Sequence, residues 1–205
     1  MNSIEKTIMN SKNHFNASAE EYDNSFDGKY VRPMYAYLME RLSREEAGCF
    51  LDIGCGTGTV LLNLVNGQRR LYGVDLSDKM VQISRHRLQG NAAIEEADAE
   101  RLPFEDNLFD LVLCNASFHH YPHPQAVLEE IRRVLMPQGT LIIGEGYAFQ
   151  PFRMLLNLYF RFADTGDFHS YGILELRKLL KKSGFQSIDS RRMGMRMFLE
   201  AKAGK

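Results

Sequence analysis

Three glycines at alternate positions form the part of the sequence best suited to bind a ligand. Gly54, Gly56 and Gly58 follow the apolar run 50–53 and precede a helical pattern. Glycine adopts backbone angles closed to other residues and leaves no Cβ between the backbone and a ligand. A loop of this kind, between a buried strand and a helix, presents free N–H groups to a polar or anionic ligand. The pattern predicts a nucleotide-like ligand at the carboxyl end of a strand.

Acidic residues near this loop further limit the classes of ligand that could bind there. The spacing Gly-x-Gly-x-Gly differs from the dinucleotide-binding fingerprint Gly-x-Gly-x-x-Gly, and Asp52 stands inside the strand end. Since a carboxylate repels pyrophosphate, Asp52 favours a ligand with an ammonium group. Asp75 follows about 20 residues past the loop, where a carboxylate can accept hydrogen bonds from both hydroxyls of a ribose. The alternative, solvated strand ends with Lys79 as a surface partner of Asp75, explains these ligand-edge positions less well.

The residues named above would come together at the edge of a parallel sheet. The order of the predicted strands and helices predicts such a sheet. Strands are predicted at 49–53, 70–75, 92–95, 109–115 and 140–145, with helices alternating between them. Residues 185–191 and 195–201 are predicted to close the sheet as an antiparallel pair. We therefore expect a single α/β domain over residues 1–205. Its fold is Rossmann-like and doubly wound: a mostly parallel seven-stranded sheet with a C-terminal antiparallel strand and helices on both faces.

Composition excludes several classes of protein. A net charge of -1 provides no basic field that would recruit nucleic acid. The three cysteines lack metal-ligand spacing, which is typical of reduced thiols. No apolar run approaches the ~18 residues of a membrane span, and the first residues lack the apolar core of a signal peptide. We expect a cytoplasmic protein with no membrane span and no nucleic-acid partner; the sequence leaves the oligomeric state open.

Segments in a fixed order resemble one known family. Leu51–Gly58 resembles motif I of the class I S-adenosylmethionine-dependent methyltransferases, and residues 72–77 resemble their acidic second motif. Residues 97–99, followed by Leu102-Pro103-Phe104, are similar to their adenine-binding loop. The later stretch, 109–139, resembles the ubiquinone and menaquinone biosynthesis subfamily. The resemblance covers about residues 48–145 and is specific as an ordered set.

This resemblance implies a cofactor, S-adenosyl-L-methionine, with S-adenosyl-L-homocysteine as its product. The glycine loop would approach the methionine part, and Asp52 would face the ammonium group. Asp75 would bind the ribose hydroxyls, and Asp98 would accept from the adenine amino group. The cofactor-binding residues that we expect are Asp52, Gly54, Cys55, Gly56, Gly58, Asp75, Leu76, Asp98, Ala99 and Asn115.

The implied reaction depends more on the positioning of donor and acceptor than on catalytic side chains. A sulfonium is already an activated methyl donor, so in-line displacement depends on orientation and exclusion of water. An oxygen nucleophile also needs a base, for which His119 and His120 are the candidates and His120 is preferred. Alternatively the pair only shapes its loop, since the subfamily has a similar pair whatever its substrate. The spacing of these histidines with His123 could indicate a metal, but no acidic or thiol partner is nearby in sequence, so we expect none.

Two aromatic-rich segments flank the predicted sheet. Residues 1–45 are predicted as an N-terminal helical lid, and residues 146–170 as a substrate-side insertion. Many small-molecule methyltransferases have a Tyr-Asp pair before the first strand, so the resemblance favours Tyr22 as a lid residue. The other residues expected to act as lid or to contact the acceptor are Tyr30, Phe118, Phe152 and Tyr159. The alternative for both segments is simple packing on the sheet.

The function that the sequence predicts is methyl transfer to a small, partly apolar or aromatic acceptor. The segment 115–118 is not the Asn/Asp-Pro-Pro-Tyr/Phe motif of amino-group DNA methyltransferases, and basic pairs are scattered along the chain. Two alternatives stay open. One is an S-adenosylmethionine-binding protein that senses or assembles without catalysing. The other is an NAD-dependent oxidoreductase, which the glycine spacing and Asp52 disfavour.

Overall fold

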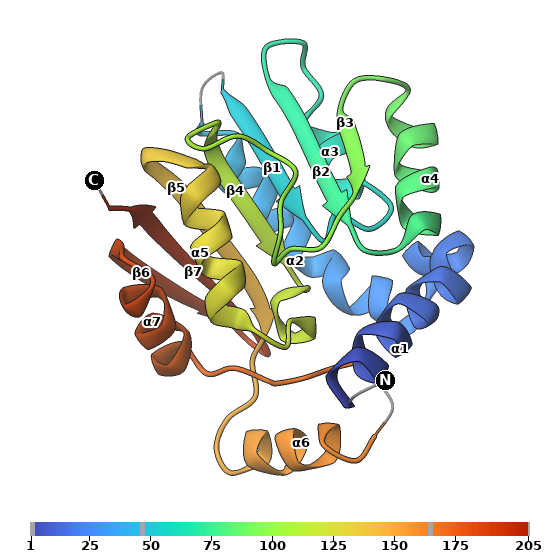
Figure 1. The fold of residues 1–205 in the computed structure, drawn as a ribbon, viewed down its shortest axis with the longest axis vertical. Coiled ribbons are helices and arrows are strands. Elements are labelled where there is room, and N and C mark those ends of the chain that lie inside the picture. The colour runs from blue at the N-terminus through green and yellow to red at the C-terminus, as the bar shows by residue number, and fades with distance from the viewer. Residues whose placement is uncertain (1–2, 46–47, 164–165, 205) are drawn as a thin grey trace.

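Seven strands form one sheet, shown in Figure 1 by a computed structural model that describes residues 3–45, 48–163 and 166–204. Their order across the sheet is β3-β2-β1-β4-β5-β7-β6. The strands are β1 (Cys49–Ile53), β2 (Arg70–Asp75), β3 (Ala93–Glu96), β4 (Phe109–Asn115), β5 (Leu135–Gly146), β6 (Phe185–Met193) and β7 (Arg196–Ala203).

The strand order reverses at β1, which pairs in parallel with β2 on one side and β4 on the other. β7 runs antiparallel to both of its neighbours, β5 and β6. The predicted doubly wound α/β class is therefore confirmed. In such sheets, ligands bind beyond the carboxyl ends of the strands at the reversal. Asp52 in β1 and Asn115 in β4 lie at that edge.

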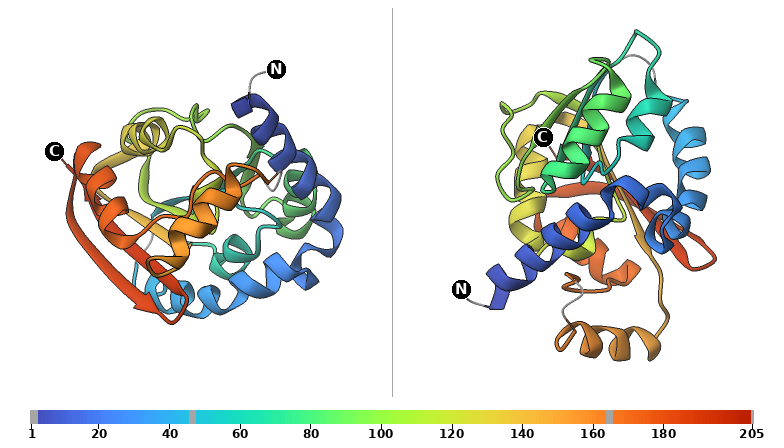
Figure 2. Two further views of the ribbon diagram at one scale, coloured as in Figure 1. Left: turned by 90° about the horizontal axis from the view of Figure 1, so that it is seen from below. Right: turned by 90° about the vertical axis from the view of Figure 1, so that its right-hand side faces the viewer.

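Helices cover both faces of the sheet (Figure 2). One face packs against α2 (Phe26–Leu42), α3 (Thr59–Leu64) and α4 (Asp78–Leu88), and the other against α5 (Pro124–Val134) and α7 (Ile173–Lys182). Successive side chains of a strand point to opposite faces. Phe50 therefore joins the core cluster of α2 and α3, while its neighbour Leu51 joins that of α5 and α7.

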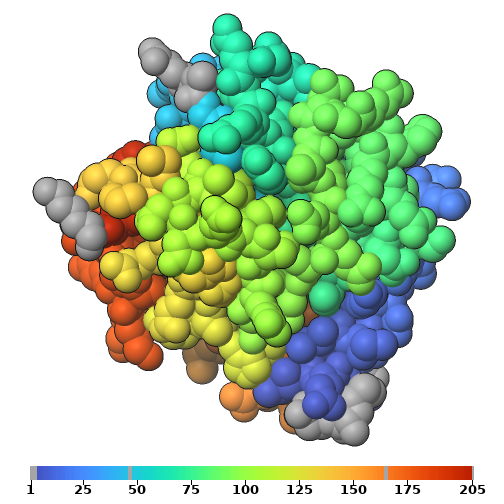
Figure 3. Space-filling view, turned by 45° about the horizontal axis from the view of Figure 1, so that its top comes forward, coloured from blue at the N-terminus to red at the C-terminus, as the bar shows by residue number. Residues whose placement is uncertain are grey.

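The N-terminal segment runs along the carboxyl edge of the sheet. It consists of α1 (Ser3–Ser18), the 3₁₀-helix η1 (Ala19–Asn24) and the start of α2. Asn16 accepts a hydrogen bond from the hydroxyl of Ser77, and the ammonium of Lys12 lies 2.6 Å from a carboxylate oxygen of Glu96. In Figure 3 this blue segment packs directly against green loops of the sheet. These contacts place it over the ends of β2 and β3.

Four strands differ in their bounds from the prediction. β6 ends two residues later than predicted, and β7 begins one residue and ends two residues later. β5 starts at Leu135 rather than at 140, because Leu135 pairs with Phe109 before a shift in register. β3 spans Ala93–Glu96, one residue later than predicted. Beyond β5, α6 (Phe152–Phe160) stands off the body at the bottom of Figure 1 and contains no buried residue. Among the residues that the structure describes, no helix is both long and apolar enough to span a membrane.

Candidate active site

The glycine loop is held in place by Asp75 from the end of β2. One carboxylate oxygen of Asp75 accepts the N–H of Gly56 at 2.8 Å, and the other accepts the N–H of Ser77 at 2.9 Å. Gly54, Gly56 and Gly58 have φ values of 71°, 53° and 76°. These angles belong to the left-handed region, which favours glycine.

The three glycines meet different surroundings. A Cβ on Gly54 would lie 2.5 Å from the Cβ of Ser117, and one on Gly58 would lie 2.5 Å from the hydroxyl of Ser84. A Cβ on Gly56 would meet no atom within 4 Å, because this residue faces a cavity. Gly58, the other glycine predicted to contact the cofactor, is not among the residues that line that cavity. Its small size instead lets the loop pack closely against α4.

Because their surroundings differ, we expect alanine at Gly58 mainly to reduce stability and alanine at Gly56 mainly to weaken ligand binding. Gly58→Ala should lower the free energy of unfolding by about 2 kcal/mol, since left-handed strain of roughly 1–2 kcal/mol adds to the overlap with Ser84. Gly56→Ala shares the strain but not the overlap, so it should unfold at higher urea concentration than Gly58→Ala. Because its new methyl group enters the cavity, Gly56→Ala should bind S-adenosylmethionine at least tenfold more weakly than the unaltered chain. Urea denaturation and calorimetric titration measure the two effects; equal stability of the variants would contradict the packing argument.

A cavity of about 1090 Å³, including its open mouth, lies over the carboxyl ends of β1, β2 and β4. Nine of the ten predicted cofactor-binding residues line it: Asp52, Gly54, Cys55, Gly56, Asp75, Leu76, Asp98, Ala99 and Asn115. Its described lining includes four carboxylates, those of Asp52, Asp75, Asp98 and Glu100, and no lysine or arginine. Such a lining suits a ligand with positive charge and is unsuited to a pyrophosphate.

Two of these carboxylates are buried close to one another. Burial, followed by the charge of Asp75, raises the pKa of Asp52 to about 8. Burial also raises the pKa of Asp75, although backbone N–H groups of Ser77 and Gly56 oppose the shift. A cation bound beside Asp52 would stabilise its ionised form. S-adenosylmethionine, with its sulfonium and ammonium groups, meets this requirement.

Proton release on binding is the expected consequence. At pH 7 the carboxyl of Asp52, with its pKa of about 8, is mostly protonated in the ligand-free protein. The ammonium group lowers this pKa, so binding should release close to one proton at pH 7 and about half as many near pH 8. Affinity should accordingly rise with pH up to about 8. Titration in buffers of different ionisation enthalpy measures the release, and Asp52→Asn should abolish it. A heat of binding that does not depend on the buffer at pH 7 would contradict the assignment.

Asp23 fastens the N-terminal segment to the glycine loop, a contact that the sequence analysis did not identify. One of its oxygens accepts the hydroxyl of Thr57 at 2.9 Å, and the other lies 3.0 Å from the guanidinium of Arg87 in α4. Its neighbour Tyr22 lines the cavity, and burial raises the pKa of the phenol, which therefore stays protonated near neutral pH. The Tyr-Asp pair itself was the available sequence signal, but only its tyrosine was singled out.

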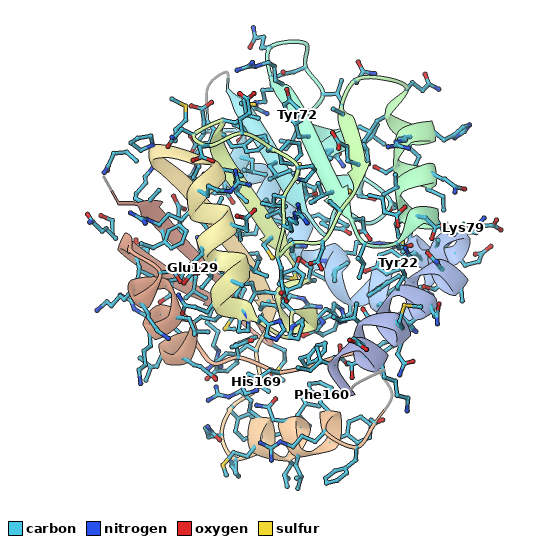
Figure 4. All side chains as sticks on the ribbon, in the orientation of Figure 1. Tyr22, Tyr72, Lys79, Glu129, Phe160 and His169 are labelled. Carbon is cyan, nitrogen blue, oxygen red and sulfur yellow. The ribbon has the colours of Figure 1, made fainter. Side chains whose placement is uncertain are left out.

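A second cavity adjoins the first beneath α6. Leu156 and Phe160 of α6 line it, together with Tyr30 and His119. The two cavities share five lining residues: Phe15, Tyr22, Val31, Ala116 and His120. Figure 4 shows Tyr22 and Phe160 on the side of the molecule where α1 and α6 approach one another. Apolar and aromatic side chains from both aromatic-rich segments therefore form part of the wall beside the cofactor cavity. The rest of the wall is polar or charged and includes His14, Asp27, His119, His120, Glu145, Asp167 and Ser170.

Three of the residues expected to act as lid or to contact the acceptor line neither cavity. The Phe118 ring is fully buried in the core, where it packs edge-to-face on Tyr121 and Tyr171. Phe152 and Tyr159 lie on the outer side of α6, with 50% and 57% of their surface exposed, and line neither cavity. The inner side of this helix carries the lining residues instead, because successive residues of a helix point in different directions.

The two adjacent histidines have opposite electrostatic environments. Burial lowers the pKa of His119, but the nearby carboxylates of Glu145 and Asp167 outweigh it and raise that pKa to about 9. One ring nitrogen of His119 lies 2.8 Å from Glu145. Burial, followed by the charge of His119, lowers the pKa of His120 well below its ordinary value. His119 is therefore a cation near neutral pH, and His120 is neutral.

The third histidine does not join this pair. His123 instead lies beside Glu100, 2.9 Å from its carboxylate. Asp167, distant in sequence, lies 3.5 Å from His119 and 3.3 Å from His120, and these three side chains could together ligate a cation. An acidic partner, absent near these histidines in the sequence, is therefore supplied by a distant segment of the chain. The Nδ1 atoms of both rings already have hydrogen-bond partners, Glu145 and the carbonyl of Gly166.

Comparisons with known proteins agree with this geometry. A family profile described as a methyltransferase domain matches residues 51–143. A sterol 4-C-methyltransferase from Caenorhabditis elegans is 30% identical over 118 residues, which are 55% of this chain and 35% of that protein. A demethylmenaquinone methyltransferase from Geobacillus kaustophilus is 32% identical over 136 residues, 61% of this chain and 57% of that protein. A SAM-dependent methyltransferase structure from Thermotoga maritima superposes with a TM-score of 0.73 at 21% identity, covering 92% of this chain and 98% of that one.

The sheet order, the acidic cavity and these matches point to one class: the chain is similar in fold and in sequence to the class I S-adenosylmethionine-dependent methyltransferases. Within that class, its sequence resembles the demethylmenaquinone methyltransferases, as the motifs after residue 109 predicted. S-adenosylmethionine is the cofactor of the class. The chain spans 35% to 57% of the length of the curated relatives described above.

Proposed function

We propose that this protein transfers a methyl group from S-adenosylmethionine to a small, partly apolar or aromatic acceptor held in the second cavity. The observation that carries this proposal is the wall common to the two cavities, formed by Phe15, Tyr22, Val31, Ala116 and His120. Donor and acceptor bound on either side of it would meet next to His120. Methyl transfer requires such a meeting, whereas storage or sensing of the cofactor would not.

The cofactor cavity fits the donor residue by residue. Asp52 would hold the ammonium group, Asp75 the ribose hydroxyls, and Asp98 with the N–H of Ala99 the adenine. When bound, the donor supplies a methyl group activated by its sulfonium for in-line displacement. The aromatic side chains of Tyr22 and Phe15, buried or half-buried around the junction, exclude water from it.

His120 is the base that we assign to an acceptor with an ionisable hydroxyl. Its Nδ1 lies 3.0 Å from the carbonyl of Gly166, an arrangement that places the proton on Nδ1 and leaves Nε2 free to accept one. Its lowered pKa keeps it unprotonated at neutral pH. His119 lines only the second cavity and carries a proton already, so it would orient the acceptor or balance charge.

Acceptor class follows from the wall of the second cavity. Leu156, Phe160 and Tyr30 offer apolar and aromatic contacts, and Glu145 and Asp167 offer polar ones. A hydroxylated ring with an apolar substituent fits this combination. The similarity of the chain to a demethylmenaquinone methyltransferase supports this choice of acceptor. We propose that the protein is cytoplasmic. Because its basic pairs are scattered along the chain, we do not propose nucleic acid as the acceptor.

Calorimetric titration with S-adenosylmethionine, S-adenosylhomocysteine and NAD tests the cofactor assignment. We expect micromolar binding of both sulfur compounds and none of NAD, which has no partner for its pyrophosphate in this acidic cavity. Incubation with methyl-labelled donor and a panel of hydroxylated rings, a demethylmenaquinone analogue included, then tests transfer. Binding of the donor without transfer to any acceptor would favour the non-catalytic alternative, and binding of NAD alone would favour an oxidoreductase.

A further inference from the structure

The amino-acid end of S-adenosylmethionine carries a carboxylate, which the acidic cofactor cavity has to accommodate. The carboxylate and the ammonium group share one carbon atom. A cofactor whose ammonium group lies at Asp52 therefore brings its carboxylate close to the same side chain. Like charges repel, and the described lining of the cavity has no lysine or arginine to compensate. The cofactor carboxylate consequently needs neutral hydrogen-bond donors.

Four N–H groups of the glycine loop are already used by the protein itself. Two of them, from residues 54 and 55, donate to the carbonyl of Val74 at 2.8 and 3.0 Å. The N–H of Gly56 donates to Asp75 at 2.8 Å, and that of Gly58 donates to the carbonyl of Cys55 at 2.9 Å. These four groups are not free to bind a carboxylate, so side chains around the cavity are the next source of donors.

Two phenol hydroxyls around the cavity meet this requirement. Tyr35 of α2 and Tyr22 of η1 both line it, and Tyr35 follows one helical turn after Val31, another lining residue. Within residues 3–45, 48–163 and 166–204, neither hydroxyl has a hydrogen-bond partner. Burial, followed by the charges of Asp52 and Asp23, raises the pKa of Tyr35 to about 12. The phenol of Tyr35 is therefore a donor near neutral pH, and it lies within reach of the charge of Asp52.

Close packing between η1 and α2 holds the two phenols near one another. Gly28 lies against the backbone of Tyr22, where a Cβ would overlap the carbonyl oxygen of Tyr22. The guanidinium of Arg32 donates to the carbonyl of Asp23 at 2.7 Å. Burial and then the neighbouring Tyr35 raise the pKa of Tyr22, which agrees with this proximity. The two hydroxyls thus form a fixed pair of donors at the Asp52 end of the cavity.

We infer that the hydroxyl of Tyr35, together with that of Tyr22, binds the carboxylate of S-adenosylmethionine and thereby selects a cofactor with an intact amino-acid end. Neutral donors suit this position, because an arginine beside Asp52 would pair with it and compete with the ammonium group of the cofactor. These contacts rest on the proposed position of the ammonium group at Asp52. They are independent of the acceptor that the protein methylates.

Decarboxylated S-adenosylmethionine is the probe for these contacts, since it keeps the ammonium, sulfonium, ribose and adenine groups and lacks the carboxylate. An acidic cavity without donors would favour this compound, whereas we expect the unaltered chain to bind S-adenosylmethionine more tightly in calorimetric titration at pH 7. Tyr35→Phe should weaken S-adenosylmethionine by about tenfold or more and leave the decarboxylated compound within about twofold. Tyr22→Phe should change the ratio of the two affinities in the same direction.

Tyr37→Phe is the matched control, because Tyr37 belongs to the same helix but packs on Phe198 and lines neither cavity. It should leave both affinities unchanged. Equal losses for the two compounds in Tyr35→Phe would show a merely structural role, and unchanged binding of S-adenosylmethionine would place its carboxylate elsewhere; either result would overturn the inference. Asp52→Asn should weaken both compounds, since both carry the ammonium group. If it weakens neither, the position proposed for the ammonium group is wrong, and the inference falls with it.

Discussion

Asp75→Ala should abolish measurable binding of S-adenosylmethionine, with an affinity at least 100-fold below that of the unaltered chain. A hydrogen bond to a charged group contributes about 1.5–3 kcal/mol, and the substitution removes the carboxylate that we propose as acceptor for both ribose hydroxyls. It also frees the N–H groups of Gly56 and Ser77, which Asp75 now holds at 2.8 and 2.9 Å. The loop thus loses its geometry together with its ribose contact. Calorimetric titration measures the loss for S-adenosylmethionine and S-adenosylhomocysteine alike.

Asp75→Asn separates the two effects. Its amide oxygen can still accept one backbone N–H, so the variant should fold and bind with affinity intermediate between those of the alanine variant and the unaltered chain. Asp189→Ala, at an exposed position on β6, is the control and should bind normally. Unchanged affinity of Asp75→Ala would show that the ribose lies elsewhere and would remove the main support for the orientation of the cofactor.

His120→Gln should lower kcat by roughly 100-fold or more while leaving the affinity for S-adenosylmethionine within about threefold. General-base catalysis by a positioned side chain contributes about 100- to 10,000-fold, which sets the expected size of the loss. Glutamine keeps a polar side chain of similar reach but cannot accept the proton. Single-turnover transfer of labelled methyl groups to a hydroxylated acceptor measures kcat. Equal losses of kcat and of cofactor affinity would indicate that His120 only shapes the cavity.

The pH profile of kcat supplies a second readout for this histidine. A lowered pKa means that His120 takes up a proton only in more acidic solution than an ordinary histidine. The acid limb of the profile should therefore lie at lower pH than an ordinary histidine would give, and kcat should stay level around neutral pH. His123→Gln, which alters an exposed histidine outside both cavities, should change neither kcat nor the profile. An acid limb centred near the ordinary histidine pKa of about 6.5 would contradict the environment assigned to His120.

Local patterns were sufficient to predict the fold and most of the cofactor cavity. Strand runs, the glycine loop and the acids at strand ends are each encoded within a few residues. A parallel sheet then brings its carboxyl ends to one edge regardless of the loops between them. Asp52, Asp75 and Asp98 come together for this reason. The packing of Gly58 could not be predicted in this way, because its neighbour Ser84 comes from α4 and no spacing in the sequence reveals that contact.

Contacts between distant segments could not be predicted in the same way. The approach of Asp167 to the histidine pair depends on how the chain returns after α6, and the sequence analysis found no acid near that pair. An apolar helix such as α6 gives no signal for which side faces inward, since nearly every position is apolar. Phe152 and Tyr159 were therefore chosen where Leu156 and Phe160 line the cavity. Phe118 follows the end of a strand, where the sequence does not distinguish an aromatic residue buried in the core from one that faces a ligand.

In the proposed arrangement, the wall between the two cavities would make the binding of donor and of acceptor thermodynamically dependent on each other. Tyr22 borders both cavities, and the adjacent Asp23 ties the same segment to the glycine loop through Thr57 and Arg87. Ordering the N-terminal segment costs conformational entropy. When one ligand has already ordered the segment, the other ligand binds without that cost. By linkage, the factor by which donor strengthens acceptor binding equals the factor by which acceptor strengthens donor binding. The N-terminal segment thereby sets how cooperatively the protein fills its two sites, before any bond is made or broken.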